Sequence, residues 1–446
     1  MKKVLIITYY WPPSGGAGVQ RWLKFTKYLP KYGWQPIIYT CKNPEYPVED
    51  HTLFDDIAPN TIVLKNKIIE PYKFYKIFTQ KKLKERVQAG FINENKKKGI
   101  VDKISVWIRG NFFIPDARML WINPSAKYLL KYLKENPVDV LVSTGPPHSM
   151  HLIAYKITRK LKIPWLADFR DPWTEIDFYS QLMLTGWADR KHHKLEKVVL
   201  DNADVITAIS EHCKIGLQNK TKTLVEVVTN GFDEDDYKDI KPKKSGKFII
   251  THLGSMNADR NPKILWKTLE KIKSENPRFG KNLIIRLIGK TDIEAIESLK
   301  KHNLIENLDN KKYLPHKEAI ELAAESSVLL LPINNTPNAM GILTGKLFDY
   351  IALKIPILCI GPTNGDASNI INKINAGFCV DFDDDKNTEK ILMDLFDKHN
   401  NNTAISPNNN IYEFSRNELT KKLVNILNSV VYEYETSMTN IDTPVG

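Results

Sequence analysis

The sequence predicts an α/β protein built from two doubly wound domains, each with a parallel sheet. Short apolar runs alternate with amphipathic helical patterns along most of the chain, as expected for parallel strands covered by helices on both faces. A polar, lysine-rich connector at residues 233–247 interrupts this alternation, and a second series follows it. The 446 residues, 42% of them hydrophobic, suffice for two cores, so a disordered or fibrous chain is excluded.

The first strand–helix–strand unit is clear in the sequence. Residues 4–7 are apolar, a turn rich in proline and glycine follows, and residues 19–29 have helical spacing before the apolar run at 37–39. This order predicts two parallel strands joined by a crossover helix. The remaining strands of the first domain are predicted at residues 62–64, 138–143, 164–167, 205–209 and 225–228.

The second series predicts a second domain of similar size. Its strands are predicted at residues 248–250, 283–288, 328–331, 355–360 and 378–380. We therefore expect a first domain at 1–233, a second at 247–410, a terminal helix at 411–433 that crosses back to the first domain, and a flexible tail at 434–446.

An insert at about residues 72–110 breaks the alternation in the first domain. Between Lys73 and Arg109 there are eleven basic and three acidic residues, a net charge of +8 out of +12 for the whole chain. Apolar residues are interleaved with this charge, a pattern typical of amphipathic helices on an anionic membrane surface. Solvated helices packed on the domain are an equal alternative. Nucleic acid is not an expected partner, because no helix-turn-helix, zinc or RNP-type motif accompanies the charge.

Cysteine usage and hydropathy bear on the compartment. The four cysteines are far apart in the sequence, which argues against a disulfide framework or a zinc site. No apolar stretch is long enough to span a bilayer. We expect a cytoplasmic protein, associated at most with the inner face of the membrane.

Five motifs occur in one order along the chain. They are Gly15-Gly16 after the first strand, Asn230-Gly231-Phe232-Asp233, Leu253-Gly254-Ser255 with Arg260, Leu329-Leu330-Leu331-Pro332, and a segment at 341–352 that reads Gly-Ile-Leu-Thr-Gly-Lys-Leu-Phe-Asp-Tyr-Ile-Ala. Together they resemble a family-four glycosyltransferase with the GT-B fold, in which two Rossmann-like domains face each other across a cleft. The segments at 115–118 and 168–173 further resemble a bacterial branch that builds surface polysaccharides.

The resemblance implies a retaining glycosyltransferase of the hexosyltransferase type. Such an enzyme moves a sugar from a nucleoside-diphosphate sugar to a hydroxyl of a glycan or lipid-linked acceptor in polysaccharide biosynthesis. It implies no cofactor and no metal, because helix dipoles and cations stabilise the departing phosphate. Two alternatives remain open: a sugar-nucleotide epimerase of the same fold, which needs no acceptor, and a non-catalytic partner subunit that binds the nucleotide sugar.

The donor diphosphate is expected at the starts of helices, where backbone N–H groups and the helix dipole attract anions. Donor-binding candidates are Gly15, Gly16, Gly254, Ser255, Arg260, Thr344, Gly345, Lys346 and Asp349. Thr344-Gly345-Lys346 would open a helix, and Asp349, one turn later, would reach the ribose. In the family motif an acid precedes Asp349 by eight residues, and here that place holds Gly341.

Catalytic candidates lie where strands of the first domain end, since ligands of open α/β sheets collect at that edge. His148 follows one predicted strand, with His151 as a weaker competitor, and Asp168, Arg170 and Asp171 end the next. The carboxylates are candidates to orient an acceptor hydroxyl or act as base. A capping role for the histidine and a structural Arg–Asp pair are the alternatives, and the acidic run at 381–385 predicts a solvated turn.

Overall fold

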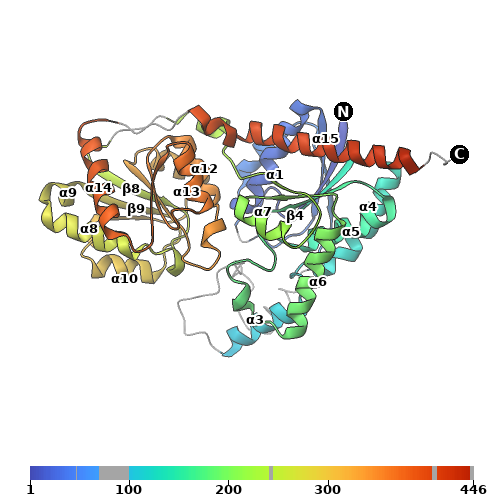
Figure 1. Cartoon of the computed structure of the whole chain (residues 1–446), viewed down its shortest axis with the longest axis horizontal. Coiled ribbons are helices and arrows are strands. Elements are labelled where there is room, and N and C mark those ends of the chain that lie inside the picture. Colours follow the sequence, from blue (N-terminus) through green and yellow to red (C-terminus); the bar gives the residue numbers. More distant parts are fainter. Residues whose placement is uncertain (47, 70–99, 241–244, 404–408, 442–446) are drawn as a thin grey trace. The chain divides into compact units, whose positions relative to one another are not determined.

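The computed structural model describes residues 1–46, 48–69, 100–240, 245–403 and 409–441. The chain divides into two compact units (Figure 1): unit 1 comprises Met1–Thr229 and Asn417–Gly446, and unit 2 comprises Asn230–Arg416. Unit 2 thus begins before the expected connector. The reason is local: Phe232 N donates to Phe414 O at 3.1 Å, and Arg416 N donates to Phe232 O at 2.7 Å. Most of the predicted basic insert, residues 70–99, lies outside the described residues.

Unit 1 contains a seven-stranded parallel sheet in the order β3-β2-β1-β4-β5-β6-β7. The central strands are buried along their length, because helices cover both faces, as in other parallel sheets. The strands are β1 (Lys2–Ile7), β2 (Trp34–Cys41), β3 (Ile62–Asn66), β4 (Val140–Gly145), β5 (Trp165–Phe169), β6 (Val205–Ala208) and β7 (Val225–Val227).

The helices of unit 1 form two layers. Those on one face are α4 (Ile122–Glu135), α5 (Ser149–Leu161), α6 (Gly186–Asn202) and α7 (Glu211–Gln218). The other face is covered by α1 (Ala17–Tyr28) and by α15 (Arg416–Ile441), whose leucines and valines pack against the same cluster. A further helix, α3 (Ile100–Phe112), contacts α6. The terminal helix is longer than predicted, since it continues to Ile441 through residues expected to be a tail.

Unit 2 contains a six-stranded parallel sheet in the order β10-β9-β8-β11-β12-β13. The strands are β8 (Phe248–Leu253), β9 (Leu283–Ile288), β10 (Leu308–Lys311), β11 (Val328–Pro332), β12 (Ile357–Ile360) and β13 (Gly377–Val380). β10 was not predicted, because its sequence Leu-Asp-Asn-Lys has no apolar run. It occupies the sheet edge, where polar side chains are tolerated.

Two helical layers also cover the sheet of unit 2. One contains α8 (Lys263–Glu275), α9 (Pro277–Asn282), α10 (Ile293–Lys301) and α14 (Asp385–Asn400). The other contains α11 (His316–Ala323), α12 (Gly345–Leu353) and α13 (Asp366–Lys373). The two sheets confirm the predicted doubly wound α/β architecture.

A buried ion pair ties the layers of unit 1 together. Asp168, at the end of β5, is fully buried and accepts from Arg21 Nη2 at 2.8 Å and from Trp22 Nε1 at 2.7 Å. The hydroxyls of Thr144 and Thr207 donate to the same carboxylate at 2.9 and 2.8 Å. Burial alone would raise the pKa of Asp168, but the charge of Arg21 and these hydrogen bonds lower it below its ordinary value.

Replacement of this carboxylate should destabilise unit 1. Asp168→Asn leaves the Arg21 guanidinium buried without its counter-charge, so we expect a loss of about 3–5 kcal/mol in the free energy of unfolding. Because the folded pKa is lowered, the contribution is complete above the ordinary pKa of an aspartate and is lost as the pH falls through the lowered value. Urea titrations followed by circular dichroism at several pH values measure both effects.

The matched control is Asp201→Asn, which removes an exposed carboxylate that pairs with Lys197 at 2.8 Å. Surface pairs of this kind contribute at most about 1 kcal/mol. Equal stability of the two variants would show that the Asp168 network does not hold the layers together.

Candidate functional site

The strongest cluster of candidate residues in unit 2 lies where β8 ends and α12 begins. Lys346 is the second residue of α12, and its Nζ lies 3.3 Å from Nε2 of His252 on β8. Gly254 has a φ of +90°, and a Cβ at this position would come within 3.2 Å of Lys346 Nζ. The glycine therefore leaves the space that the ammonium occupies.

The start of α12 offers backbone donors beside this ammonium. Thr344 is the N-cap residue in extended conformation, and its side chain makes no capping hydrogen bond. Its buried Oγ1 has no hydrogen-bond partner among the described residues. The first N–H groups of a helix have no partner within the helix, so Gly345 and Lys346 present donors to an anion together with the helix dipole.

Arg260 is fixed at the same edge of the sheet. It ends the short helix η6 (Ala258–Arg260), where its Nε donates to Asn334 Oδ1 at 2.9 Å and its Nη1 to Ser255 O at 3.1 Å. Burial, followed by the nearby Arg260, lowers the pKa of the Lys346 ammonium well below its ordinary value. Two cations held this close favour an anionic ligand.

Asp349 lies one turn after Lys346 and is held by two neighbours. Tyr237 donates its hydroxyl to Asp349 Oδ1 at 2.6 Å, and His316 Nε2 lies 3.4 Å from the same oxygen. Burial and the charge of Asp349 raise the pKa of Tyr237 well above its ordinary value, so its hydroxyl remains a donor. Gly341, in the place of the family's first acid, is buried in the short helix η8 (Ala339–Gly341).

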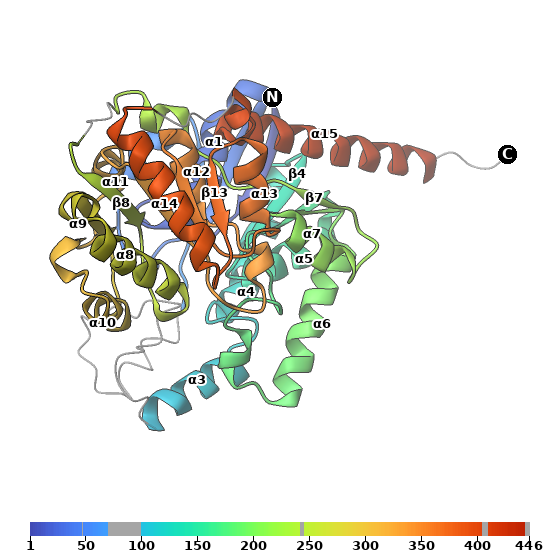
Figure 2. The same ribbon diagram turned by 60° about the vertical axis from the view of Figure 1, so that its left-hand side comes forward.

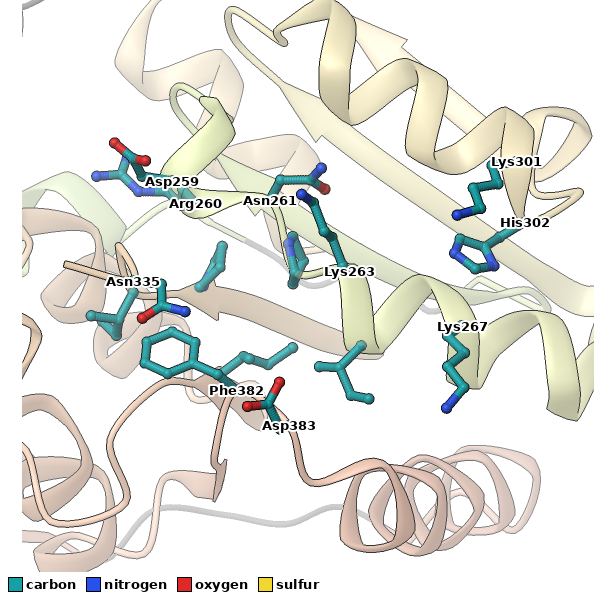
Figure 3. A pocket seen from close by; sticks show the side chains of 15 residues that line it. Asp259, Arg260, Asn261, Lys263, Lys267, Lys301, His302, Asn335, Phe382 and Asp383 are labelled. Atoms are coloured by element: carbon teal, nitrogen blue, oxygen red, sulfur yellow. The ribbon is translucent and has the colours of Figure 1, made fainter.

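A second hollow of unit 2 begins on another side of Arg260 (Figure 3). It has a volume of about 410 Å³ and is bordered by α8, by the residues after β11 and by Phe382 and Asp383. Two of its three lysines are paired, Lys263 with Glu294 at 3.0 Å and Lys267 with Asp385 at 3.2 Å, and Lys301 also lines it.

In unit 1 the glycine turn opens α1 as predicted. Gly15 N donates to Val48 O at 2.9 Å, and Gly16 is the N-cap residue of α1 with a φ of +83°. Among the described residues other than its two chain neighbours, no atom lies within 4 Å of a Cβ built on Gly16. The turn thus leaves the backbone at the start of α1 open to approach.

The two histidines of the β4–α5 segment are buried in an aromatic cluster. The His148 ring stacks on Trp173 at 4.5 Å, and the His151 ring stacks on Phe169 at 4.7 Å. His148 Nδ1 and His151 Nε2 have no hydrogen-bond partner among the described residues, and each lies within 3 Å of a Cβ built on Gly145. Burial lowers the pKa of both, that of His151 to about 3, so both rings are neutral at pH 7.

The remaining catalytic candidates fall into different environments. Asp168 is buried and its carboxylate is engaged by Arg21 and Trp22, which favours the structural alternative, and its catalytic role stays a prediction. Arg170 donates to the carbonyls of Gly18 and Pro146, and its guanidinium therefore joins the start of α1 to the segment between β4 and α5. Asp171 is partly exposed, and its carboxylate makes no hydrogen bond within the described part of the chain. Burial raises the pKa of Asp171, which makes it the better candidate base.

Sequence reasoning missed several neighbours of these residues. His252 lies inside an otherwise apolar strand, Phe-Ile-Ile-Thr-His-Leu, and that isolated polar residue was the signal that could have revealed it. Tyr237 and Asn334 had no such signal, because their roles depend on contacts with Asp349 and Arg260 across the fold.

Comparison with known structures shows that the fold is shared with glycosyltransferases. Sucrose-phosphate synthase from Thermosynechococcus elongatus has a TM-score of 0.64 at 11% identity, with 97% of this chain and all of that chain (100%) covered. WaaG, described as a glycosyltransferase involved in lipopolysaccharide biosynthesis, has a TM-score of 0.55 at 13% identity, with 95% and 99% covered. A variant of S. aureus TarM in complex with Fondaparinux, alpha-GlcNAc-glycerol and UDP has a TM-score of 0.59 at 10% identity, with 96% and 100% covered.

The sequence comparison matches unit 2 to a known protein family. Among curated proteins none matches the chain significantly in sequence. The model of the family "Glycosyl transferases group 1" matches residues 233–411, a range that includes Gly254, Arg260, Lys346 and Asp349. Residues 233–411 of unit 2 therefore form a glycosyl transferases group 1 domain, and the chain has the fold of the GT-B glycosyltransferases.

Proposed function

We propose that the protein transfers a sugar from a nucleoside-diphosphate sugar to a hydroxyl of a glycan or lipid-linked acceptor, with retention, in bacterial polysaccharide biosynthesis. One observation carries the proposal: the Lys346 ammonium, Arg260 and the start of α12 meet at Gly254. The combination of two cations, helix N–H groups and a glycine that leaves room suits a diphosphate. The TarM structure, of similar fold, is described in complex with UDP.

The same residues would stabilise the nucleoside diphosphate as it leaves the sugar. Negative charge grows on the diphosphate as the glycosidic bond breaks, and fixed cations and helix dipoles stabilise such charge without rearranging. Lys346 and Arg260 supply this stabilisation, and no metal is required in the proposed mechanism. Retention follows from the family resemblance, in which the leaving phosphate deprotonates the incoming hydroxyl on the same face of the sugar.

Asp349 and Tyr237 would serve the nucleoside. Asp349 Oδ1 is taken by the Tyr237 hydroxyl at 2.6 Å, which fixes the carboxylate and leaves its other oxygen to accept from ribose hydroxyls. In unit 1, His148 is a candidate to contact the donor sugar and Asp171 a candidate to orient the acceptor hydroxyl. Gly15 and Gly16 remain candidate donor contacts through the backbone at the start of α1.

A donor panel tests the proposed function. We expect the protein to release nucleoside diphosphate from one of the uridine, guanosine or thymidine diphosphate sugars, faster with a glycan acceptor than without one, and equally well with a chelator present. Nuclear magnetic resonance of the product should show that the transferred sugar keeps the anomeric configuration that it had in the donor. Release of a rearranged free sugar without an acceptor would instead support the epimerase alternative.

A non-catalytic role is the second candidate, and Gly341 is the observation that favours it. The glycine cannot make the contact to the donor sugar that the family's first acid makes. If the protein binds nucleotide sugars but neither transfers nor slowly hydrolyses any of them, the partner-subunit alternative replaces the enzymatic one.

Removal of either cation should slow turnover. Lys346→Met and Arg260→Ala each withdraw a charge from the developing phosphate, so we expect kcat/KM to fall by about ten- to a hundred-fold. Initial rates with the best donor of the panel measure the effect. Lys354→Met, an exposed lysine at the other end of α12, is the matched control and should retain the wild-type rate. Wild-type rates in both test variants would remove these residues from the site.

We also propose that unit 1 contacts an anionic membrane. Figure 2 shows α3 lying beside the start of α6, to which Asn111 joins it by accepting from Thr185 N at 2.6 Å. We call the exposed apolar residues of these two helices the α3 surface: Ile104, Trp107, Ile108, Phe112 and Trp187. Lys191 lies over the Trp187 ring at 4.7 Å, and the lysines and arginines of the insert adjoin α3 in sequence. No helix in the described part of the chain is both long and apolar enough to cross a bilayer.

Vesicle sedimentation tests this contact. Vesicles with anionic lipid should retain the protein at low salt and release it at high salt, because counterions screen the attraction. Trp107→Ser combined with Trp187→Ser should weaken binding by about ten-fold or more through loss of apolar insertion. The control is Tyr432→Ser, which changes an exposed aromatic residue of α15. Binding that is insensitive to salt and to both tryptophans would contradict the proposal.

A further inference from the structure

An imidazole lies directly behind the Lys346 ammonium. His252 is fully buried on β8, paired in register with Leu287 of β9. Its Nδ1 lies 3.0 Å from Leu330 O on β11. A carbonyl oxygen can only accept. Leu330 O at Nδ1 is nearer to the ring than Ser255 O at Nε2, 3.0 Å against 3.3 Å, so we assign the hydrogen to Nδ1 and the lone pair to Nε2.

The geometry at Nε2 identifies its partner. Lys346 Nζ and Ser255 O each lie 3.3 Å from it. A lone pair cannot donate to the Ser255 carbonyl, whereas it can accept from the lysine. The hydrogen bond therefore runs from Lys346 to His252 and holds Nζ over Gly254.

Few charged groups surround the pair. Arg260 at the end of η6, together with Asp349 and Tyr350 on α12, are the ionisable neighbours. Tyr350 donates its hydroxyl to the same Leu330 carbonyl at 3.3 Å. The neighbours on β9 and β11 are apolar side chains. Among the described residues, Arg260 is thus the cation and Asp349 the anion that act on the Lys346 ammonium, and His252 beside it is neutral.

We propose that His252 is a positioning residue for donor binding, which fixes Lys346 toward the diphosphate. The inference rests on the proposed function and adds to it a residue of β8. Lysine on a flexible stem can adopt many rotamers, and an acceptor behind Nζ selects the one that faces the ligand.

Electrostatics also predicts that Lys346 gains a proton when the diphosphate binds. Burial and Arg260 lower the pKa of Lys346 in the empty site, and burial and Lys346 lower the pKa of His252. His252 thus remains neutral and able to accept. An arriving diphosphate raises the pKa of Lys346, because a nearby negative charge favours the ammonium. Binding should therefore consume a proton, and affinity should fall as the pH rises through the lowered pKa.

Calorimetry with uridine, guanosine and thymidine diphosphates tests the proposal. Titrations from about pH 8 to pH 10, where the free diphosphate is already ionised, follow the affinity as Lys346 loses its proton. We expect the affinity of the wild type to fall over this range and that of Lys346→Met to stay constant. His252→Phe should weaken binding by about ten-fold, because Nζ loses the acceptor that fixes it. His252→Gln, whose side-chain oxygen can accept from Nζ, should restore part of the affinity.

A double-mutant cycle separates positioning from folding. If His252 acts through Lys346, adding His252→Phe to Lys346→Met should weaken binding no further. A merely structural defect would instead weaken binding beyond the loss that Lys346→Met causes alone. His399→Phe is the matched control, at the end of α14. Additive losses, or wild-type affinity in His252→Phe, would overturn this inference alone. If the wild type binds none of the diphosphates, the proposed function fails and the inference with it.

Discussion

The candidate site depends on one constraint: two basic side chains must be held side by side for a diphosphate. Lys346 and Arg260 repel each other, and their burial opposes ionisation. The fold meets this constraint with neutral acceptors. Asn334 Oδ1 and Ser255 O hold Arg260, and His252 faces Lys346. Because these acceptors carry no negative charge, they fix the cations without competing with an anionic ligand for them.

The parallel sheet supplies these acceptors from neighbouring strands. β8 carries His252 and ends before Gly254, and β11, its neighbour, carries Leu330 and is followed by Asn334. Residues distant in sequence therefore meet at the carboxyl edge, where ligands of open α/β folds bind. Unit 1 uses the corresponding edge differently. There a buried carboxylate, Asp168, pairs with Arg21 at 2.8 Å.

This contrast explains what the sequence could and could not reveal. Apolar periodicity located the twelve strands other than β10 within a few residues, since buried parallel strands are largely apolar. β10 was missed because an edge strand can be polar. Asp168 looked catalytic because its position at a strand end is the same for a ligand-binding and a structural carboxylate. Only the partners Arg21, Trp22, Thr144 and Thr207, far apart in sequence, distinguish the two.

The same reasoning bears on Gly341, the main departure from the family motif. The loss of an acid removes one negative charge from the neighbourhood of the donor sugar, and the remaining acid, Asp349, is shorter than the glutamate of the motif. In this chain Tyr237 reaches Asp349 at 2.6 Å, and His316 approaches from α11. The shorter carboxylate is thus fixed by contacts from two other elements. Because these contacts still orient Asp349, they favour a functional donor site, which would bind the nucleoside, over a remnant of such a site.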